Sequence, residues 1–241
     1  VAVFDGSEGV QAQSETVWRQ GQKYELACLC FVNKMDKTGA DFEMTLHSIR
    51  DKLGACPIPV QLPIGAQDSF EGIIDLIKMK AVFYNTQKLG AIFEETDIPE
   101  MLMPKAREYR HHMIELAAEQ DEQLMDAYVH DKPVKQEMIS RAIRKGTVGN
   151  KLHPVFVGSA LRYIGVQKVL DGVVEYLPSP LERPVIEGYS PKDRKKKISI
   201  KCNPDDPLVA LAFKLTSDKH GDLYFLRIYQ GTLKAGTRVL N

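Results

Sequence analysis

The segment Asn33-Lys34-Met35-Asp36 contains the residues best suited to ligand chemistry, because it directly follows the apolar run Leu26–Val32. If that run is a buried parallel strand, its carboxyl end is where α/β sheets bind ligands. The Asp36 carboxylate can accept two hydrogen bonds at once, and guanine offers two adjacent donors, its ring N1–H and its exocyclic amine. Adenine has an acceptor at that ring position and would leave the carboxylate unpaired. The Lys34 stem can lie across a base, and the Asn33 amide can bridge two loops.

An ordinary strand-to-helix loop, with Asp36 capping the next helix, accounts equally well for these four residues taken alone. The later segment Gly158-Ser159-Ala160 favours base recognition, because it follows a second apolar run, residues 154–157. Its small residues let backbone N–H groups approach a ligand carbonyl closely, although Gly-Ser after a strand is also a common turn. Together, Asn-Lys-x-Asp and Ser-Ala match the paired guanine-recognition motifs of the P-loop GTPases.

The elements around these motifs alternate between apolar strands and helices. We expect strands at residues 1–4, 26–32 and 154–157, and helices at residues 11–24, 39–53 and 165–177. Continuous apolar strands separated by helices are typical of a parallel sheet that is covered on both faces. The sequence therefore predicts an α/β fold.

A long insertion separates the two motifs. Residues 37–158 number 122, whereas one strand-to-strand crossover takes about 30, so roughly 90 residues are surplus. Strand patterns at 58–64 and 72–84 come before helical patterns at 105–118 and 134–144. We therefore predict an α+β subdomain at residues 57–149, inserted into a sheet formed by residues 1–56 and 150–180.

The C-terminal part has a different pattern. Residues 181–206 are rich in proline and charge, which predicts a linker. From residue 207 to residue 241, apolar runs separated by turn residues predict the first antiparallel strands of a β-barrel. Both ends of the sequence have the character of internal positions, so we expect a segment of a longer chain.

Composition excludes several classes of protein. The 241 residues are 44% hydrophobic and carry 32 basic and 32 acidic side chains, which excludes a disordered chain and an overall basic field for nucleic acid. The four cysteines lack CxxC spacing, so we expect neither a metal site nor disulfides, and a cytoplasmic protein. No apolar run approaches the ~20 residues of a membrane span, so we expect no membrane partner. Because the net charge is zero, we expect no DNA partner either.

Longer phrases carry a specific resemblance. They are Gln13–Gln20, Phe31–Asp36, Leu62–Gly65, Gly72–Leu76, Gly158–Ala160, Gly165–Gln167 and Tyr176–Pro180. With them, the chain resembles the bacterial elongation factor G family of translational GTPases over essentially its whole length. The resemblance implies a partial P-loop GTPase sheet, an inserted G′ subdomain and the start of a β-barrel second domain. It also implies that Asn33, Lys34 and Asp36 recognise guanine, that Ser159 and Ala160 close over its carbonyl, and that Leu161 packs beside the base.

The resemblance further implies a function: GTP hydrolysis on the ribosome that promotes translocation of tRNA and mRNA, with GTP or GDP and Mg²⁺ bound by the full-length protein. The ribosomal partners would be ribosomal RNA and the stalk protein, the latter met by the inserted subdomain. A ribosome-recycling or ribosome-protection paralogue, and a non-catalytic ribosome-binding module, are the alternatives.

Two motifs of such enzymes do not occur in this sequence. One is Gly-x-x-x-x-Gly-Lys-Ser/Thr, which holds phosphates and Mg²⁺, and the other is the catalytic Asp-x-x-Gly-His. We therefore expect no catalytic residue here, and expect the chain alone neither to bind nucleotide tightly nor to hydrolyse it. Candidate RNA contacts are the run Arg194, Lys195, Lys196 and Lys197, which a solvated linker explains as well, and Arg227, which an exposed strand explains as well.

Overall fold

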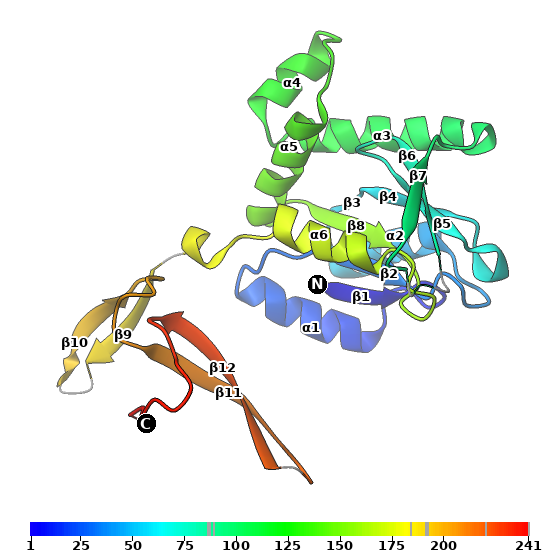
Figure 1. The fold of residues 1–241 in the computed structure, drawn as a ribbon. Helices are drawn as coiled ribbons and strands as arrows, with labels where there is room; N and C mark the ends of the chain where they lie inside the picture. Colours follow the sequence, from blue (N-terminus) through cyan, green and yellow to red (C-terminus); the bar gives the residue numbers. More distant parts are fainter. Residues whose placement is uncertain (86–87, 89, 184, 191–192, 220, 241) are drawn as a thin grey trace. The chain divides into compact units, whose positions relative to one another are not determined.

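The computed structural model describes residues 1–85, 88, 90–183, 185–190, 193–219 and 221–240 (Figure 1). The chain divides into two compact units, Val1–Leu177 and Pro178–Asn241. The first unit contains both predicted base-recognition motifs. The second contains the predicted linker and barrel strands.

The first unit is built around a four-stranded parallel sheet with the strand order β1-β2-β8-β3. Its strands are β1 (Ala2–Asp5), β2 (Cys30–Asn33), β8 (His153–Val157) and β3 (Pro57–Pro59). Asp5 lies opposite Asn33 in the register of β1 and β2. Because the strands are parallel, the loops after β1, β2 and β8 leave the sheet at the same end. The predicted α/β fold with a parallel sheet is confirmed, although β2 begins at Cys30 and not at Leu26.

Three helices flank this sheet, α1 (Ala12–Lys23), α2 (Phe42–Leu53) and α6 (Val166–Tyr176). Figure 1 shows α1 and α6 on either side of it. Asp41 caps α2, since its carboxylate accepts a hydrogen bond from the backbone N–H of Met44 at 2.9 Å. On α6, Gly172 lets the helix approach β8, because a Cβ at that position would lie 2.2 Å from the ring of Phe156.

The structure corrects the first boundary of the predicted insertion. Residues 57–59 pair in parallel with β8, so they belong to the parallel sheet and not to the inserted part. The backbone N–H of Val60 donates to the carbonyl of Val155 in β8. Successive backbone nitrogens in a strand point in alternate directions, so the nitrogens of Pro57 and Pro59 point away from β8 and no hydrogen bond to it is lost. A proline is tolerated there because β3 is an edge strand. The other domain boundaries stay predictions.

The inserted part is an antiparallel sheet followed by helices. The sheet has the order β4-β5-β6-β7, with β4 (Gln61–Ile64), β5 (Gly72–Asp75), β6 (Lys80–Tyr84) and β7 (Phe93–Thr96). The helices are α3 (Met103–Ala118), α4 (Glu122–Val129) and α5 (Gln136–Val148), with short 3₁₀ turns at Gln67–Ser69 and Glu100–Leu102. Strands therefore precede helices, as the sequence predicts.

The insertion shares its core with the parallel sheet. One hydrophobic cluster includes Phe4 and Val155 of the parallel sheet, Ile73 of the antiparallel sheet and Met113 of α3. The buried Gln61 side chain of β4 also accepts a hydrogen bond from the backbone of Val157 at 3.3 Å. The insertion and the parallel sheet thus form one compact body.

The second unit contains two antiparallel strand pairs and a 3₁₀ turn at Pro180–Glu182. The pairs are β9 (Ile186–Ser190) with β10 (Asp193–Ile200), and β11 (Val209–Asp218) with β12 (Gly221–Gln230). The second pair follows the prediction. The first pair lies within residues 181–206, where we predict a linker, and Ile186 lies opposite Ile200, a cross-strand pair of the kind that stabilises a hairpin.

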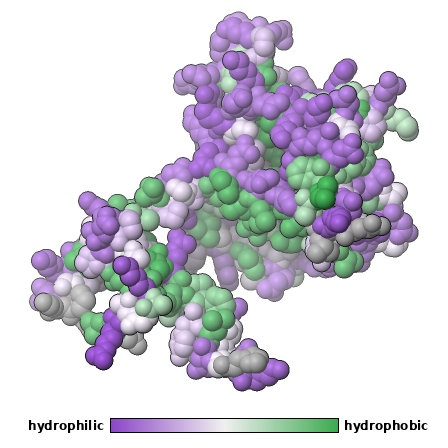
Figure 2. Space-filling view, viewed as in Figure 1, coloured by the Kyte–Doolittle hydropathy of each residue, from purple (hydrophilic) through white to green (hydrophobic). Residues whose placement is uncertain are grey.

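Polar and apolar side chains separate on the surface. Figure 2 shows polar side chains over α3, α4 and α5 and apolar side chains around α6 and β1. The exposed apolar residues there include Val3, Leu170 and Val174, the last with 82% of its surface accessible. Among the described residues, no helix combines the length and the apolar character that a membrane crossing requires.

Candidate functional site

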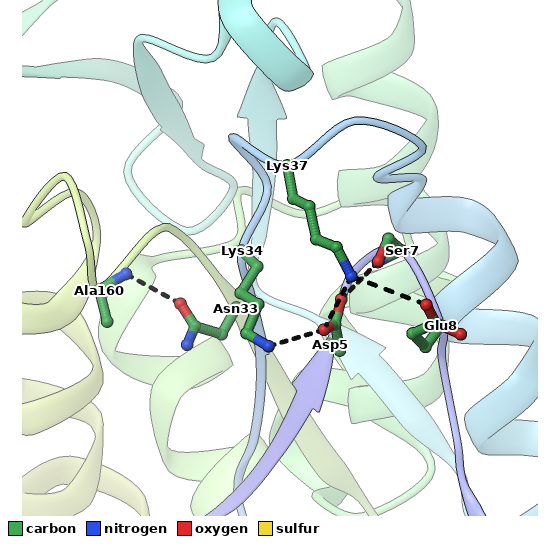
Figure 3. A network of polar contacts seen from close by, with 7 residues as sticks. All are labelled: Asp5, Ser7, Glu8, Asn33, Lys34, Lys37 and Ala160. Carbon is green, nitrogen blue, oxygen red and sulfur yellow. Dashed lines mark hydrogen bonds and ion pairs between the residues drawn. The ribbon is translucent and has the colours of Figure 1, made fainter.

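The two predicted base-recognition motifs meet at one end of the parallel sheet. Asn33 Oδ1 accepts a hydrogen bond from the backbone N–H of Ala160 at 2.8 Å, although 127 positions separate the two residues (Figure 3). The backbone N–H of Met35 also donates to the carbonyl of Gly158, at 3.2 Å. The structure therefore brings together the loop after β2 and the loop after β8, and the Asn33 amide bridges them.

Lys34 is tied to the end of the neighbouring strand. Its backbone has φ of 64°, and its Nζ lies 2.8 Å from Oδ2 of Asp5. The other carboxylate oxygen of Asp5 accepts hydrogen bonds from the backbone N–H and the hydroxyl of Ser7, at 3.0 and 2.7 Å. Lys37 adds a second cation, 3.5 Å from Asp5 and 3.6 Å from Glu8. Figure 3 shows these side chains converging on Asp5.

This network shifts the ionisation of both partners. Burial opposes ionisation of the Asp5 carboxyl, but the hydrogen bonds from Lys34 and Ser7 outweigh it and hold its pKa well below the usual range. The hydrogen bond to Asp5, and the attraction between the two charges, raise the pKa of Lys34. The pair is therefore ionised throughout the neutral range, and the Lys34 stem is held in place by its charged end.

Asp36 does not cap the following helix, because Asp41 occupies that position. The side chain of Asp36 is 11% exposed, and its Oδ2 lies 3.7 Å from Nε of Arg162. An ionised carboxylate has more acceptor positions than one distant guanidinium nitrogen can use. The alternative of an ordinary helix cap is therefore excluded, and Asp36 keeps acceptor capacity for a ligand.

The residues after β8 form a closed turn. Ser159 is fully buried, its Oγ accepts a hydrogen bond from the backbone N–H of Arg162 at 3.1 Å, and its backbone exchanges two hydrogen bonds with Ile164. Leu161, by contrast, is 81% exposed. Because the N–H of Ala160 already donates to Asn33, a base carbonyl that approaches this N–H must share it or displace the Asn33 amide.

The candidate RNA-contact residues lie in the second unit. Arg227 stands on β12 with its guanidinium 5.7 Å from the centre of the Tyr229 ring. Lys197 forms an ion pair with Glu187 at 2.7 Å, and Lys195 and Lys196 lie on the same strand, β10. The side chain of Arg194 lies outside the described part of the chain. The basic run is thus on a hairpin, and Arg227 is on a different strand pair.

In the part of the chain that the structure describes, no three or more His, Cys, Asp or Glu side chains are grouped to hold a metal ion. Sequence reasoning missed two polar residues that the structure places beside the motifs, Asp5 and Arg162. The role of Asp5 could have been predicted, because Asp5 ends an apolar strand that a parallel sheet would place beside the strand before Asn33. The role of Arg162 could not, because its contacts depend on how the insertion packs against the parallel sheet.

Comparisons with known proteins agree on one family. Residues 1–179 match the family described as elongation factor Tu GTP binding domain. The chain is 49% identical to elongation factor G of Wolbachia pipientis subsp. Culex pipiens (strain wPip), in an alignment of 242 residues that covers all of this chain and 35% of that protein. The chain therefore spans about a third of the length of this curated relative.

A solved structure shows the same fold. A crystal structure of a protein from Thermus thermophilus matches with a TM-score of 0.75 and 28% sequence identity. The match covers 97% of this chain and 32% of that chain.

Proposed function

Because the chain belongs to the elongation factor Tu GTP-binding domain family, we propose that it supplies the guanine-recognition part of a translational GTPase. The base-recognition loops are residues 33–36, after β2, and residues 159–161, after β8. In the full-length protein, GTP hydrolysis on the ribosome promotes translocation of tRNA and mRNA. The 49% identity with an elongation factor G over the whole chain supports this elongation role over recycling, ribosome protection or a non-catalytic module.

The observation that carries the proposal is the 2.8 Å hydrogen bond between Asn33 and Ala160. It joins two motifs that are individually weak and makes them one site. Asp36 then accepts from N1–H and the exocyclic amine of guanine, and Lys34 lies along a face of the base with its ammonium held by Asp5. Ser159 shapes the turn that closes over the base carbonyl. Leu161 is exposed and free to pack beside the base.

The residues described here fit a guanine base better than an adenine base. A carboxylate is an acceptor only, so it pairs with two donors and repels the ring nitrogen acceptor of adenine. Asp36 is largely withdrawn from water, with 11% of its side chain exposed. An unmatched base therefore leaves a poorly solvated carboxylate with only the guanidinium of Arg162, at 3.7 Å, as its partner, which makes the discrimination strong.

GTP, with Mg²⁺ on its phosphates, supplies the phosphoanhydride bond that is hydrolysed. The phosphate-binding motif does not occur in these 241 residues, so the residues present here bind the base and not the phosphates. We expect this chain by itself to bind GDP more weakly than about 1 μM and not to hydrolyse GTP, because the phosphates normally supply most of the nucleotide's charged contacts. Tight binding of labelled GDP, or measurable turnover, would contradict this expectation.

The proposed partner is the ribosome in the cytoplasm, through ribosomal RNA and the stalk protein. Arg227 and the run Lys195–Lys197 are the proposed RNA contacts, and each phosphate contact makes binding weaken with salt. Helices α3 and α5 of the insertion are the proposed face for the stalk protein. Charge reversal on the exposed side of α3 should lower stalk binding, and unchanged binding would exclude that face.

A base swap tests the guanine site directly. The substitution Asp36→Asn is made in the full-length protein. It replaces one carboxylate oxygen, an acceptor, with an amide NH₂ group, a donor. Xanthine has a carbonyl where guanine has its amine, so the variant should lose about 100-fold or more in GDP affinity and gain affinity for xanthosine diphosphate. Asp41→Asn is the matched control, because asparagine caps a helix as well as aspartate and should leave GDP binding unchanged. If Asp36→Asn changes neither the affinity for GDP nor the affinity for xanthosine diphosphate, the assignment of Asp36 to the guanine site is refuted.

A further inference from the structure

Arg162 connects the base-recognition loops to the inserted sheet. Its Nη1 lies 3.4 Å from the backbone carbonyls of both Asp68 and Phe70, and its Nε faces Asp36 at 3.7 Å. Its Nη2 lies 3.9 Å from the Asp68 carboxylate, which is fully exposed and so contributes little. The arginine is about one-third exposed, so its head group is held mainly by backbone oxygens of the insertion.

The turn that supplies those carbonyls is built rigidly. Gly65 has φ of 74°, and a Cβ there would lie 2.0 Å from the carbonyl oxygen of Ser69, so only glycine fits. The hydroxyl of Ser69 donates to the carbonyl of Ala66 at 2.7 Å and accepts from its N–H at 3.2 Å. Phe70 is 2% exposed and fixes the end of the turn in the core. We call residues 65–70 the platform turn.

The platform turn also holds the loop after β2 directly. The backbone N–H of Gln67 donates to the carbonyl of Met35 at 2.7 Å. Gln67 has φ of 57°, an uncommon conformation for a non-glycine residue. Met35 itself is buried, with 1% of its surface exposed. The residue immediately before Asp36 is therefore fixed from the insertion side, while Arg162 approaches Asp36 itself.

We infer that Arg162, seated on the platform turn, is a positioning residue for Asp36, so that the insertion takes part in setting base specificity. The inference rests on the proposed guanine site. The guanidinium attracts one carboxylate oxygen and limits rotation of the Asp36 side chain about χ2. A carboxylate held in one orientation can meet both donors of guanine at once, whereas a freely rotating one loses entropy when it does so. A base with a single donor gains less from the same restraint.

The test compares GDP with inosine diphosphate, whose base lacks the exocyclic amine, in the full-length protein. Arg162→Gln should weaken GDP binding about threefold to fivefold, as expected for a partly exposed ion pair, and should weaken inosine diphosphate binding less. The ratio of the two affinities therefore narrows. Arg162→Lys keeps the charge without the forked head group and should restore part of that ratio.

Two control variants separate positioning from general packing. Arg110 is a matched arginine, because its Nη1 also donates to two backbone carbonyls, those of Leu76 and Ile77, away from the base loops. Arg110→Gln should lower thermal stability and leave the affinity ratio unchanged. Asp68→Ala removes only the exposed carboxylate and should also leave the ratio unchanged.

A third variant tests the platform turn itself. Gly65→Ala disturbs this turn without changing Arg162, and it should reduce the ratio of GDP affinity to inosine diphosphate affinity as Arg162→Gln does.

The outcomes distinguish this inference from the proposed function. If the unaltered full-length protein binds no guanine nucleotide, the guanine site is wrong. If it binds GDP and Arg162→Gln leaves the ratio of GDP to inosine diphosphate affinity intact, the site stands and the positioning role of Arg162 is refuted. An equal loss for both nucleotides refutes it as well, since that result indicates a packing defect.

Discussion

Replacing Asp5 by Asn isolates the ion pair that holds Lys34. The asparagine side chain keeps an oxygen that can accept both hydrogen bonds from Ser7, so these two contacts survive. The 2.8 Å ion pair with Lys34 and the longer contact with Lys37 are lost. The substitution changes charge with almost no change in volume.

The size of the effect follows from exposure. The Asp5 side chain is 15% exposed, but that of Lys34 is 55% exposed, so solvent screens much of the attraction. We therefore expect Asp5→Asn to lower the free energy of unfolding by about 1 kcal/mol. In a compact unit of this size, that loss lowers the midpoint of thermal unfolding by about 2–4 °C.

The effect depends on pH with a definite sign. The folded-state pKa of Asp5 lies below its ordinary value of 3.8, so the unfolded chain binds the proton more readily. The stability that the carboxylate contributes is therefore complete above about pH 5 and is lost as the pH falls through the lower, folded-state pKa. The unfolding midpoints of the parent and Asp5→Asn should differ by a constant amount from pH 8 to pH 5, and the difference should shrink progressively below pH 4 as the pH falls toward the folded-state pKa of Asp5.

Thermal unfolding followed by circular dichroism measures this difference, at 0.05 and 1 M salt and across the pH range. High salt should reduce the difference at neutral pH, because partly exposed charges are screened. Identical midpoints at neutral pH and low salt would refute the ion pair as a stabilising contact. A difference that is unchanged by both pH and salt would show that Asn disturbs packing and not charge.

Three further substitutions probe other contacts of the first unit. Asn33→Ala removes the hydrogen bond to Ala160 and should lower the free energy of unfolding by about 1 kcal/mol, measured by urea denaturation. It should also weaken GDP binding by the full-length protein, measured by nucleotide titration. Asp41→Ala removes the cap of α2 and should cost about 1 kcal/mol in urea denaturation, with Asp41→Asn neutral. Gly172→Ala places a methyl group against Phe156 and should cost about 1–3 kcal/mol through overpacking, seen as a lower thermal midpoint; an unchanged midpoint would show that α6 can shift freely.

The sequence was sufficient to predict the parts of the site that depend on local pattern. Asn33 and Asp36 follow an apolar strand, Ala160 follows another, and parallel strands leave a sheet at one end. Their convergence follows from these rules alone. The position of β3 does not, because the strand pattern at residues 58–64 runs on from β3 into β4, and only the pairing with β8 shows that β3 belongs to the parallel sheet.

Contacts made by tertiary folding were beyond prediction. The carbonyls of Asp68 and Phe70 reach Arg162 only because the insertion folds back on the parallel sheet. The strand β7, whose residues are mostly exposed and show no apolar strand pattern, is fixed by pairing with β6. The hairpin of β9 and β10 likewise depends on which residues come opposite each other, which a charged, proline-bounded segment does not reveal.

The pairing of β3 with β8 sets an order for assembly during synthesis. Gln61 of β4 and Val157 of β8 form a hydrogen bond although 96 positions separate them. The strands β3 and β4 are therefore synthesised well before β8, the strand that they contact. At ordinary translation rates this interval lasts about 5–20 s, during which the edge of β2 that β8 will occupy is open to wrong partners. Ala160 emerges only after β8, so the proposed base site is completed after the parallel sheet. A nascent chain stalled before residue 160 should therefore lack the Asn33–Ala160 hydrogen bond on which the proposed guanine site depends.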